Sequence, residues 1–174
     1  MFRETDTANA RNLVMTTEDD SNPLLVPVDF SSHSEAALVC AAELAETLGN
    51  KLVILHVVHD PGEAPGYYSI KGRDQQLRRM EDVAAEMLDD FFQQMQKKHP
   101  GLPALKHATT MLVVGLPVNR ILESAEKIHA RMIIMGSQGR TGLAHAMLGS
   151  KAEQVVRLAP VPVMIVKYGK QQEA

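Results

Sequence analysis

The sequence predicts an α/β fold, a five-stranded parallel sheet with helices on both faces. Three observations predict it. Five short apolar segments alternate with segments whose apolar residues recur at helical spacing. Residues 51–58 are almost wholly apolar, as expected of a parallel strand covered on both faces. Strands separated by helices throughout the chain favour a parallel sheet, and right-handed crossovers leave few topologies.

The first strand is predicted at residues 24–28. Pro27 cannot donate to a ladder, but near the end of a strand, where pairing stops, it is tolerated. The helix that follows has a candidate capping box, Ser32 and Glu35, and runs to about residue 48. Gly49 then provides a left-handed C-cap.

After the second strand, residues 60–72 form a loop with prolines and glycines, and a long helix is predicted at 74–98. The methionines of its apolar stripe are interpreted as core filler and not as a binding surface. The stripe consists of Leu77, Met80, Ala84, Met87, Leu88, Phe91 and Met95.

The second half of the chain repeats the pattern. A third strand at 109–114 leads through Gly115 and Pro117 into a helix. A fourth strand at 132–135 opens into a glycine-rich loop, and a fifth at 161–166 is entered through Pro160 and Pro162. The core-facing residues of the helix are Ile121, Leu122, Ala125 and Ile128.

Composition indicates one soluble globular domain in 174 residues, with 45% hydrophobic and 22% charged residues. No apolar run approaches the ~20 residues of a membrane span, and no signal peptide is evident, so we expect a cytoplasmic protein. The single cysteine, Cys40, excludes an internal disulfide and is interpreted as a packed small residue.

The domain is predicted at residues 23–170, between a mobile extension at 1–22 and a short tail at 171–174. The extension accounts for the net charge of −3, because the remainder has as many basic as acidic residues. This balance argues against a nucleic-acid surface. Met1 and Met15 are both possible start residues.

Residues 131–151 read as a strand, a glycine-rich turn and a helix start. Glycines let a backbone approach a ligand closely, and a helix start offers unpaired N–H groups, so phosphate is the expected guest. The spacing matches neither a P-loop nor G-x-G-x-x-G. Ser150 and Glu153 form a second candidate capping box, and the glycines are Gly136, Gly139, Gly142 and Gly149.

After the apolar strand, the sequence has the pattern Gly, two residues, Gly, nine residues, Gly-Ser. This pattern resembles the ATP-binding branch of the universal stress protein family. The segments VPVDFS and LHVV also look like that family's first two strands, so the resemblance covers about residues 23–168. It implies a Rossmann-like sheet of strand order 3-2-1-4-5. It further implies a regulatory, non-enzymatic homodimer that binds ATP, with Mg²⁺, in a stress response.

The resemblance implies which residues of this chain bind ATP. Among them, Val57 would contact adenine through its backbone. The full set is Pro27, Val28, Asp29, Val57, Met135, Gly136, Ser137, Gln138, Gly139, Arg140, Thr141, Gly142, Gly149, Ser150 and Lys151. One departure from the family is Arg131, where an acidic residue is usual. It precedes the fourth strand at the end away from the site, so we expect little effect.

Several of these residues also have plainer interpretations. The residues alone leave Asp29 evenly divided between binding a ribose or Mg²⁺ and capping the turn into the first helix. A solvated loop position suits Arg140 nearly as well as a contact to phosphate. Tyrosines in a surface loop, such as Tyr67 and Tyr68, are more often packed or exposed than a cover for a base. His56 lies in a buried strand, and the histidine spacing indicates no zinc site.

Two other functions compete with ATP-dependent regulation. Adenylating enzymes resemble this sheet but carry S-G-G-x-D-S after the first strand, where this chain has no glycine between Asp29 and Ser34. No nucleophile–base pair stands out either. A nucleotide-free dimeric scaffold is the other competing function.

For each of these functions we expect a homodimer through residues 161–166. Both sides of this edge strand are apolar, because Val161, Val163 and Ile165 face one side and Met164 and Val166 the other.

Overall fold

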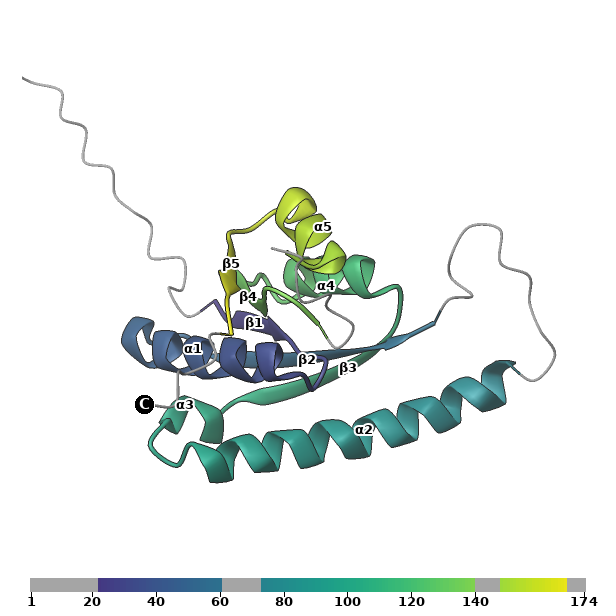
Figure 1. The fold of residues 1–174 in the computed structure, drawn as a ribbon, viewed down its shortest axis with the longest axis horizontal. Helices are drawn as coiled ribbons and strands as arrows, with labels where there is room; N and C mark the ends of the chain where they lie inside the picture. Colours follow the sequence, from purple (N-terminus) through teal and green to yellow (C-terminus); the bar gives the residue numbers. More distant parts are fainter. Residues whose placement is uncertain (1–21, 61–72, 140–147, 169–174) are drawn as a thin grey trace, which may run out of the picture.

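The computed structural model describes residues 22–60, 73–139 and 148–168, with side chains of the long helix from residue 79 onward. All five strands are parallel in the order β3-β2-β1-β4-β5, which confirms the predicted fold (Figure 1). The elements are β1 (Leu24–Pro27), α1 (Ser32–Leu48), β2 (Leu52–His59), α2 (Arg73–Lys98), α3 (Pro103–Lys106), β3 (Thr109–Gly115), α4 (Pro117–Lys127), β4 (Met132–Gly136), α5 (Ser150–Leu158) and β5 (Val163–Val166).

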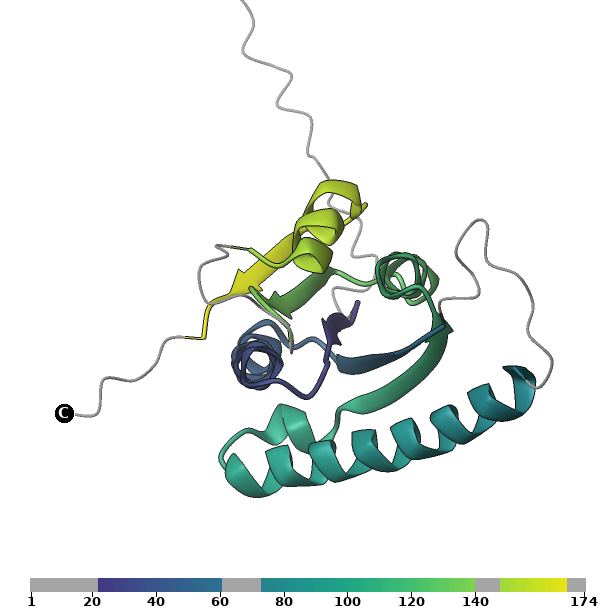
Figure 2. The ribbon, with the colours of Figure 1, turned by 45° about the vertical axis from the view of Figure 1, so that its right-hand side comes forward.

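Helices cover both faces of the sheet, as Figure 2 shows: α1, α2 and α3 on one face, α4 and α5 on the other. Successive strand residues point to opposite faces, so Leu24 joins the core under α1 while Leu25 joins the core under α4. None of the helices in the described part of the chain is long and apolar enough to span a membrane.

The first helix begins one residue earlier than its sequence predicts. Ser31, not Ser32, is the N-cap, and its hydroxyl accepts a hydrogen bond from the Ser34 amide at 3.3 Å. The Ser32–Glu35 capping box is therefore wrong. Gly49 takes the left-handed conformation expected of the C-cap, with φ of 70°.

The stripe on α2 is only half buried. Ala84, Leu88, Phe91 and Met95 pack in the core, which confirms Met95 as core filler. Met80 and Met87 are 48% and 40% exposed, so that interpretation is wrong for both. In Figure 1 the N-terminal end of α2 extends beyond the ends of β2 and β3.

Both outer strands differ slightly from their predicted bounds. β3 extends to Gly115, and β5 begins at Val163, after Pro162, whose carbonyl accepts from the Ile133 amide. The alternation predicted for β5 is confirmed, because its side chains contact both cores. The short helix α3 was not predicted, because four residues carry too little periodicity to signal one.

Pro27 shapes the middle of the sheet. The Val28 amide donates to Leu55 of β2, so by alternation the position of Pro27 faces β4. Pairing between β1 and β4 covers only Leu24 with Met132 and Leu25 with Ile133. A residue without an N–H therefore sits where that ladder has already ended. The two strands part beyond this point.

Candidate functional site

The site lies where β1 and β4 separate at their carboxyl ends. The strand order reverses between these two neighbours, since β1 leads back to β2 and β4 leads on to β5. Ligands of open α/β sheets bind at such a switch point. Asp29 follows β1 there, and Gly136 is the last residue of β4.

The two carboxylate oxygens of Asp29 have different surroundings. Oδ1 accepts hydrogen bonds from the Ser31 hydroxyl at 2.6 Å and from the Ser31 amide at 3.2 Å. Oδ2 faces the glycine loop, 2.6 Å from where a Cβ on Gly139 would lie. Oδ1 thus makes the turn predicted by the plainer interpretation, while Oδ2 is directed at the turn after β4.

The glycines of this turn are required by space. A Cβ on Gly136 would lie 2.8 Å from the backbone carbonyl carbon and oxygen of His33, and one on Gly139 would strike Asp29. Neither residue has a positive φ; among the described glycines only Gly49 and Gly115 do. Close approach of neighbouring groups, and not a left-handed backbone, therefore requires glycine at these two positions.

The start of α5 packs against the same turn. The Gly149 amide donates to the Ser137 carbonyl at 2.8 Å, and Gly149 is the N-cap of the helix. Because glycine has no side chain, no side-chain cap is made. The Ser150–Glu153 capping box is therefore wrong, and Ser150 is the first helical residue. The amides of the first turn lack intrahelical acceptors and leave a positive dipole end at the switch point.

The other described site residues contribute in different ways. Val28 and Met135 are buried in the two cores, so only their backbones are available to a ligand. Val57 lies two residues beyond the level of Pro27, which pairs with Leu55, and so reaches past the end of β1. Ser137 is buried and its amide donates to Val166, while Gln138 lies in the turn and Lys151 is exposed.

Five of the discussed residues lie outside the described part of the chain. They are Arg140, Thr141, Gly142, Tyr67 and Tyr68. Their proposed roles remain predictions.

Sequence reasoning missed an aromatic cluster beneath the turn after β1. Phe30 has a φ of 64° and lies 4.3 Å, centroid to centroid, from the ring of His56 and 5.4 Å from that of Phe91. His56 Nδ1 lies 2.8 Å from the Val28 carbonyl oxygen, so this partly buried ring has a hydrogen-bond partner. The left-handed Phe30 turns the chain from β1 toward α1, and no local signal marks a phenylalanine for that conformation.

The backbone and Cβ of His33 lie against Gly136, so an imidazole is a further ionisable group near the site. Among the described residues, no group of three or more His, Cys, Asp and Glu side chains is placed to hold a metal ion. Cys40, on α1, has a pKa raised by burial and by the nearby Glu43 carboxylate. A raised pKa keeps the thiol protonated and supports its interpretation as a packing residue.

A parallel sheet with a glycine turn and an exposed helix start at its switch point defines a class of ligand-binding α/β proteins. Within that class, this chain belongs to the Universal stress protein family, whose family model matches residues 21–167. The predicted family is confirmed. Its ATP-binding branch stays a prediction.

Relatives and solved structures agree with this assignment. The chain is 29% identical to a universal stress protein of Methanocaldococcus jannaschii over 92% of its length and 91% of the relative. It is also 29% identical to one of Bacillus subtilis over 84% and 99%. The structure of the universal stress protein UspA from Lactobacillus plantarum superposes with a TM-score of 0.71 at 27% identity, covering 84% of this chain and 97% of that one.

Proposed function

We propose that this protein is a nucleotide-responsive regulator of a stress response that binds ATP, with Mg²⁺, between the carboxyl ends of β1 and β4. The observation that carries the proposal is the convergence of three elements at the switch point. They are the Asp29 carboxylate, the glycine turn 136–139 and the uncapped start of α5.

Each element matches one part of a nucleotide. The turn and the first amides of α5 would donate to phosphate oxygens, which the helix dipole favours at the same place. The backbone at Val57 lies beyond the end of β1, where the family resemblance puts the adenine contact. Pro27, Val28 and Met135 line the same strand ends and would contact the base or ribose through backbone atoms.

Asp29 is the described residue best suited to hold Mg²⁺. Magnesium usually takes one or two carboxylates together with phosphate oxygens and waters, and so needs no dedicated cluster of protein ligands. Asp29 Oδ2 faces the turn where the phosphates would lie. When bound, Mg²⁺ would neutralise phosphate charge beside this carboxylate.

Two proteins of the same fold support adenine nucleotides as the ligand class. One universal stress protein has been crystallised in complex with cAMP; it shares 22% identity with this chain at a TM-score of 0.60, covering 83% of this chain and 96% of that one. Another, from Archaeoglobus fulgidus, is in complex with dAMP, at 22% identity and a TM-score of 0.50, covering 83% of this chain and 97% of that one. Their ligands belong to those proteins, and to this chain only by proposal.

A regulatory role also predicts slow chemistry. Fast phosphoryl transfer needs a residue that positions water and a cation that meets developing charge, and in the sequence only Arg140 is an evident candidate for that cation. We therefore expect hydrolysis well below about 1 s⁻¹, the low end for ordinary enzymes. We further propose that the protein is cytoplasmic and acts as a homodimer through β5.

Calorimetry with Mg·ATP tests the site. The wild type should bind, and Gly139→Ala should bind at least roughly tenfold more weakly, because its Cβ would displace the Asp29 carboxylate. Gly101→Ala is the matched control, since a Cβ there meets nothing within 4 Å and its φ is not positive. Equal affinities for two folded variants would place ATP elsewhere. If the wild type showed no heat of binding, the result would favour the nucleotide-free scaffold over ATP-dependent regulation.

A further inference from the structure

The turn after β1 is held by aromatic side chains from two other elements. Phe30 has a φ of 64°, in the left-handed region, which costs free energy in any residue with a Cβ. Its ring lies 4.3 Å from that of His56 on β2, at an interplanar angle of 30°, and 5.4 Å from that of Phe91 on α2, edge to face. A strained backbone persists only where the surroundings enforce it, and here two rings hold the strained residue.

The backbone on both sides of Phe30 is also tied. The Val28 carbonyl oxygen lies 2.8 Å from His56 Nδ1. Because a carbonyl only accepts hydrogen bonds, that nitrogen carries the proton. After Phe30, the Ser34 hydroxyl of α1 donates to the Ser31 carbonyl at 2.9 Å. The conformation of the turn is therefore fixed from α1, α2 and β2 together.

Phe30 is the central residue of the turn that orients the Asp29 carboxylate. Oδ1 of Asp29 reaches over it to the Ser31 amide at 3.2 Å and the Ser31 hydroxyl at 2.6 Å. If φ of Phe30 returned to negative values, the Ser31 amide would leave Oδ1. Oδ2 would then no longer be directed at the turn that contains Gly139. The direction of the carboxylate thus depends on the conformation of the next residue.

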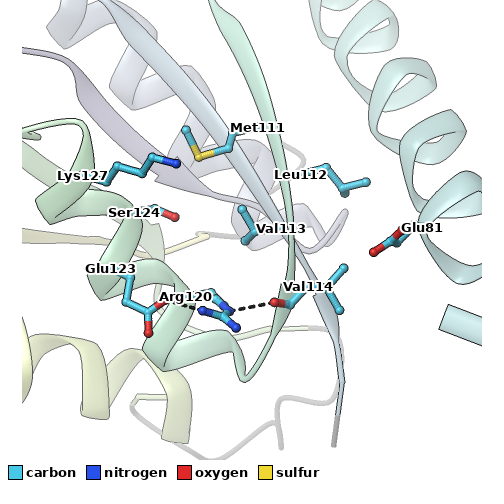
Figure 3. Close-up of a pocket in the computed structure, with 9 residues that line it drawn as sticks. All are labelled: Glu81, Met111, Leu112, Val113, Val114, Arg120, Glu123, Ser124 and Lys127. Carbon is cyan, nitrogen blue, oxygen red and sulfur yellow. Dashed lines mark hydrogen bonds and ion pairs between the residues drawn. The ribbon is translucent and has the colours of Figure 1, made fainter. Parts of the chain in front are cut away.

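Helix α2 contributes none of the residues proposed to bind the nucleotide, yet Phe91 connects it to this turn. The first turns of the helix are loosely packed: Met80 and Met87 are exposed, and Glu81 lines a cavity of about 580 Å³ at the edge of β3 (Figure 3). Farther along, Phe91 is buried and packs in the core. Its ring therefore joins a firmly packed part of α2 to the residue beside Asp29.

We propose that Phe30 is a positioning residue for Mg²⁺, held in its strained conformation by Phe91. It acts through Asp29, whose carboxylate it directs toward the place proposed for the phosphates. This inference rests on the proposed function, because it takes Asp29 as the protein ligand of Mg²⁺ beside ATP. It makes α2, a helix outside the nucleotide site, a determinant of the affinity for Mg·ATP and not of the affinity for free ATP.

Calorimetry of Phe30→Ala and Phe91→Leu tests the proposal. Both variants should bind Mg·ATP roughly tenfold more weakly than the wild type, whereas ATP in EDTA should bind them at least as tightly. Phe92→Leu is the matched control, because it makes the same change at the neighbouring residue of α2. The partly buried Phe92 packs on the same core and makes no ring contact within the described part of the chain. Its variant should bind Mg·ATP as the wild type does.

A double substitution separates positioning from a merely structural role. In Asp29→Asn, the further change Phe30→Ala should cause no additional loss of affinity for Mg·ATP, because the carboxylate that Phe30 directs is gone. A loss of equal size with and without Mg²⁺, or one that persists in Asp29→Asn, would overturn the proposal. Wild-type affinity for Mg·ATP in both Phe30→Ala and Phe91→Leu would overturn it as well.

Amide hydrogen exchange without nucleotide distinguishes a failure of this inference from a failure of the proposed function. The Ser31 amide, which donates to Asp29, should exchange roughly tenfold faster in Phe30→Ala and in Phe91→Leu than in the wild type and in Phe92→Leu. Unchanged exchange would overturn the role of Phe30 whether or not ATP binds. Faster exchange in the two variants, together with no ATP binding by the wild type, would refute nucleotide binding and support the orientation of Asp29 by Phe30.

Discussion

Asp29 Oδ2 lies 2.6 Å from where a Cβ on Gly139 would lie, so the residue after the first strand touches the turn after the fourth. More than a hundred positions separate these residues in the chain, yet the order β3-β2-β1-β4-β5 makes their strands neighbours. Both sides of the proposed nucleotide site thereby meet at one carboxylate.

Asp29→Asn should separate metal binding from turn formation. The amide oxygen still accepts from Ser31, so we expect the fold to remain. Affinity for Mg·ATP should fall roughly 10- to 150-fold, because a hydrogen bond to a charged group contributes about 1.5–3 kcal/mol. Without Mg²⁺ the variant should bind ATP at least as tightly as the wild type, because the carboxylate would then only repel the phosphates. Calorimetry in the presence of Mg²⁺ and in the presence of EDTA measures the two affinities. An equal loss of affinity under both conditions would show that Asp29 does not hold Mg²⁺.

Gly136→Ala should destabilise the domain itself. Its Cβ would lie 2.8 Å from backbone atoms of His33, which cannot move without shifting the start of α1. Overpacking of this kind costs about 1–3 kcal/mol. Urea unfolding should show a lower midpoint at unchanged slope, with Gly101→Ala within about 0.5 kcal/mol of the wild type. A midpoint shared by all three proteins would contradict the tight contact.

Met164→Lys should weaken the proposed dimer. β5 is an outer strand with partly buried apolar side chains toward both cores. Pairing with its two-fold mate would cover it. Light scattering should give about twice the chain mass of 19.1 kDa for the wild type and a shift toward monomer for the variant. Met80→Lys, on exposed α2, controls for a new charge and should leave the mass unchanged. A monomeric wild type at micromolar concentration would refute dimerisation alone.

Cys40 should react slowly with iodoacetamide at neutral pH. Its pKa is raised first by burial and then by Glu43, so less thiolate is present than for an ordinary cysteine. The rate should rise at higher pH, and Glu43→Gln should move the profile toward lower pH. A folded-state pKa above the unfolded value also means that this group's stabilisation is complete below the unfolded pKa. It is lost as the pH rises through the folded pKa. A pH profile identical to that of a cysteine peptide would contradict the shift.

The sequence predicts the sheet well because its signals are repeated along each element. Residues 52–59 are apolar except for His56 and His59, and the two helix ends marked by Gly49 and Pro117 are where glycine and proline predict them. Caps were misplaced by one residue, because Ser31 and Ser32 carry the same hydroxyl and only backbone geometry selects one. The N-cap of α5 is Gly149, and a glycine has no side chain that would identify it as a cap in the sequence.

Long-range contacts set the remainder of the site. The need for glycine at position 139 comes from Asp29, and no local pattern reveals a neighbour so distant in the chain. Met80 and Met87 share one helical stripe with Met95, but both of their side chains are exposed whereas that of Met95 is buried. Helical periodicity tells which residues share a side of a helix; it does not tell how far the partner surface extends.

The short ladder between β1 and β4 divides the sheet mechanically. Two residue pairs join the three-stranded part, β3-β2-β1, to the two-stranded part, β4-β5, while α1 packs across the seam and contacts both. Thermal opening should follow this seam, with β4, α5 and β5 separating as one cooperative unit once α1 loosens. A molecule bound across the strand ends would hold the two parts of the sheet together. Occupancy of the site and cohesion of the sheet would then rise together.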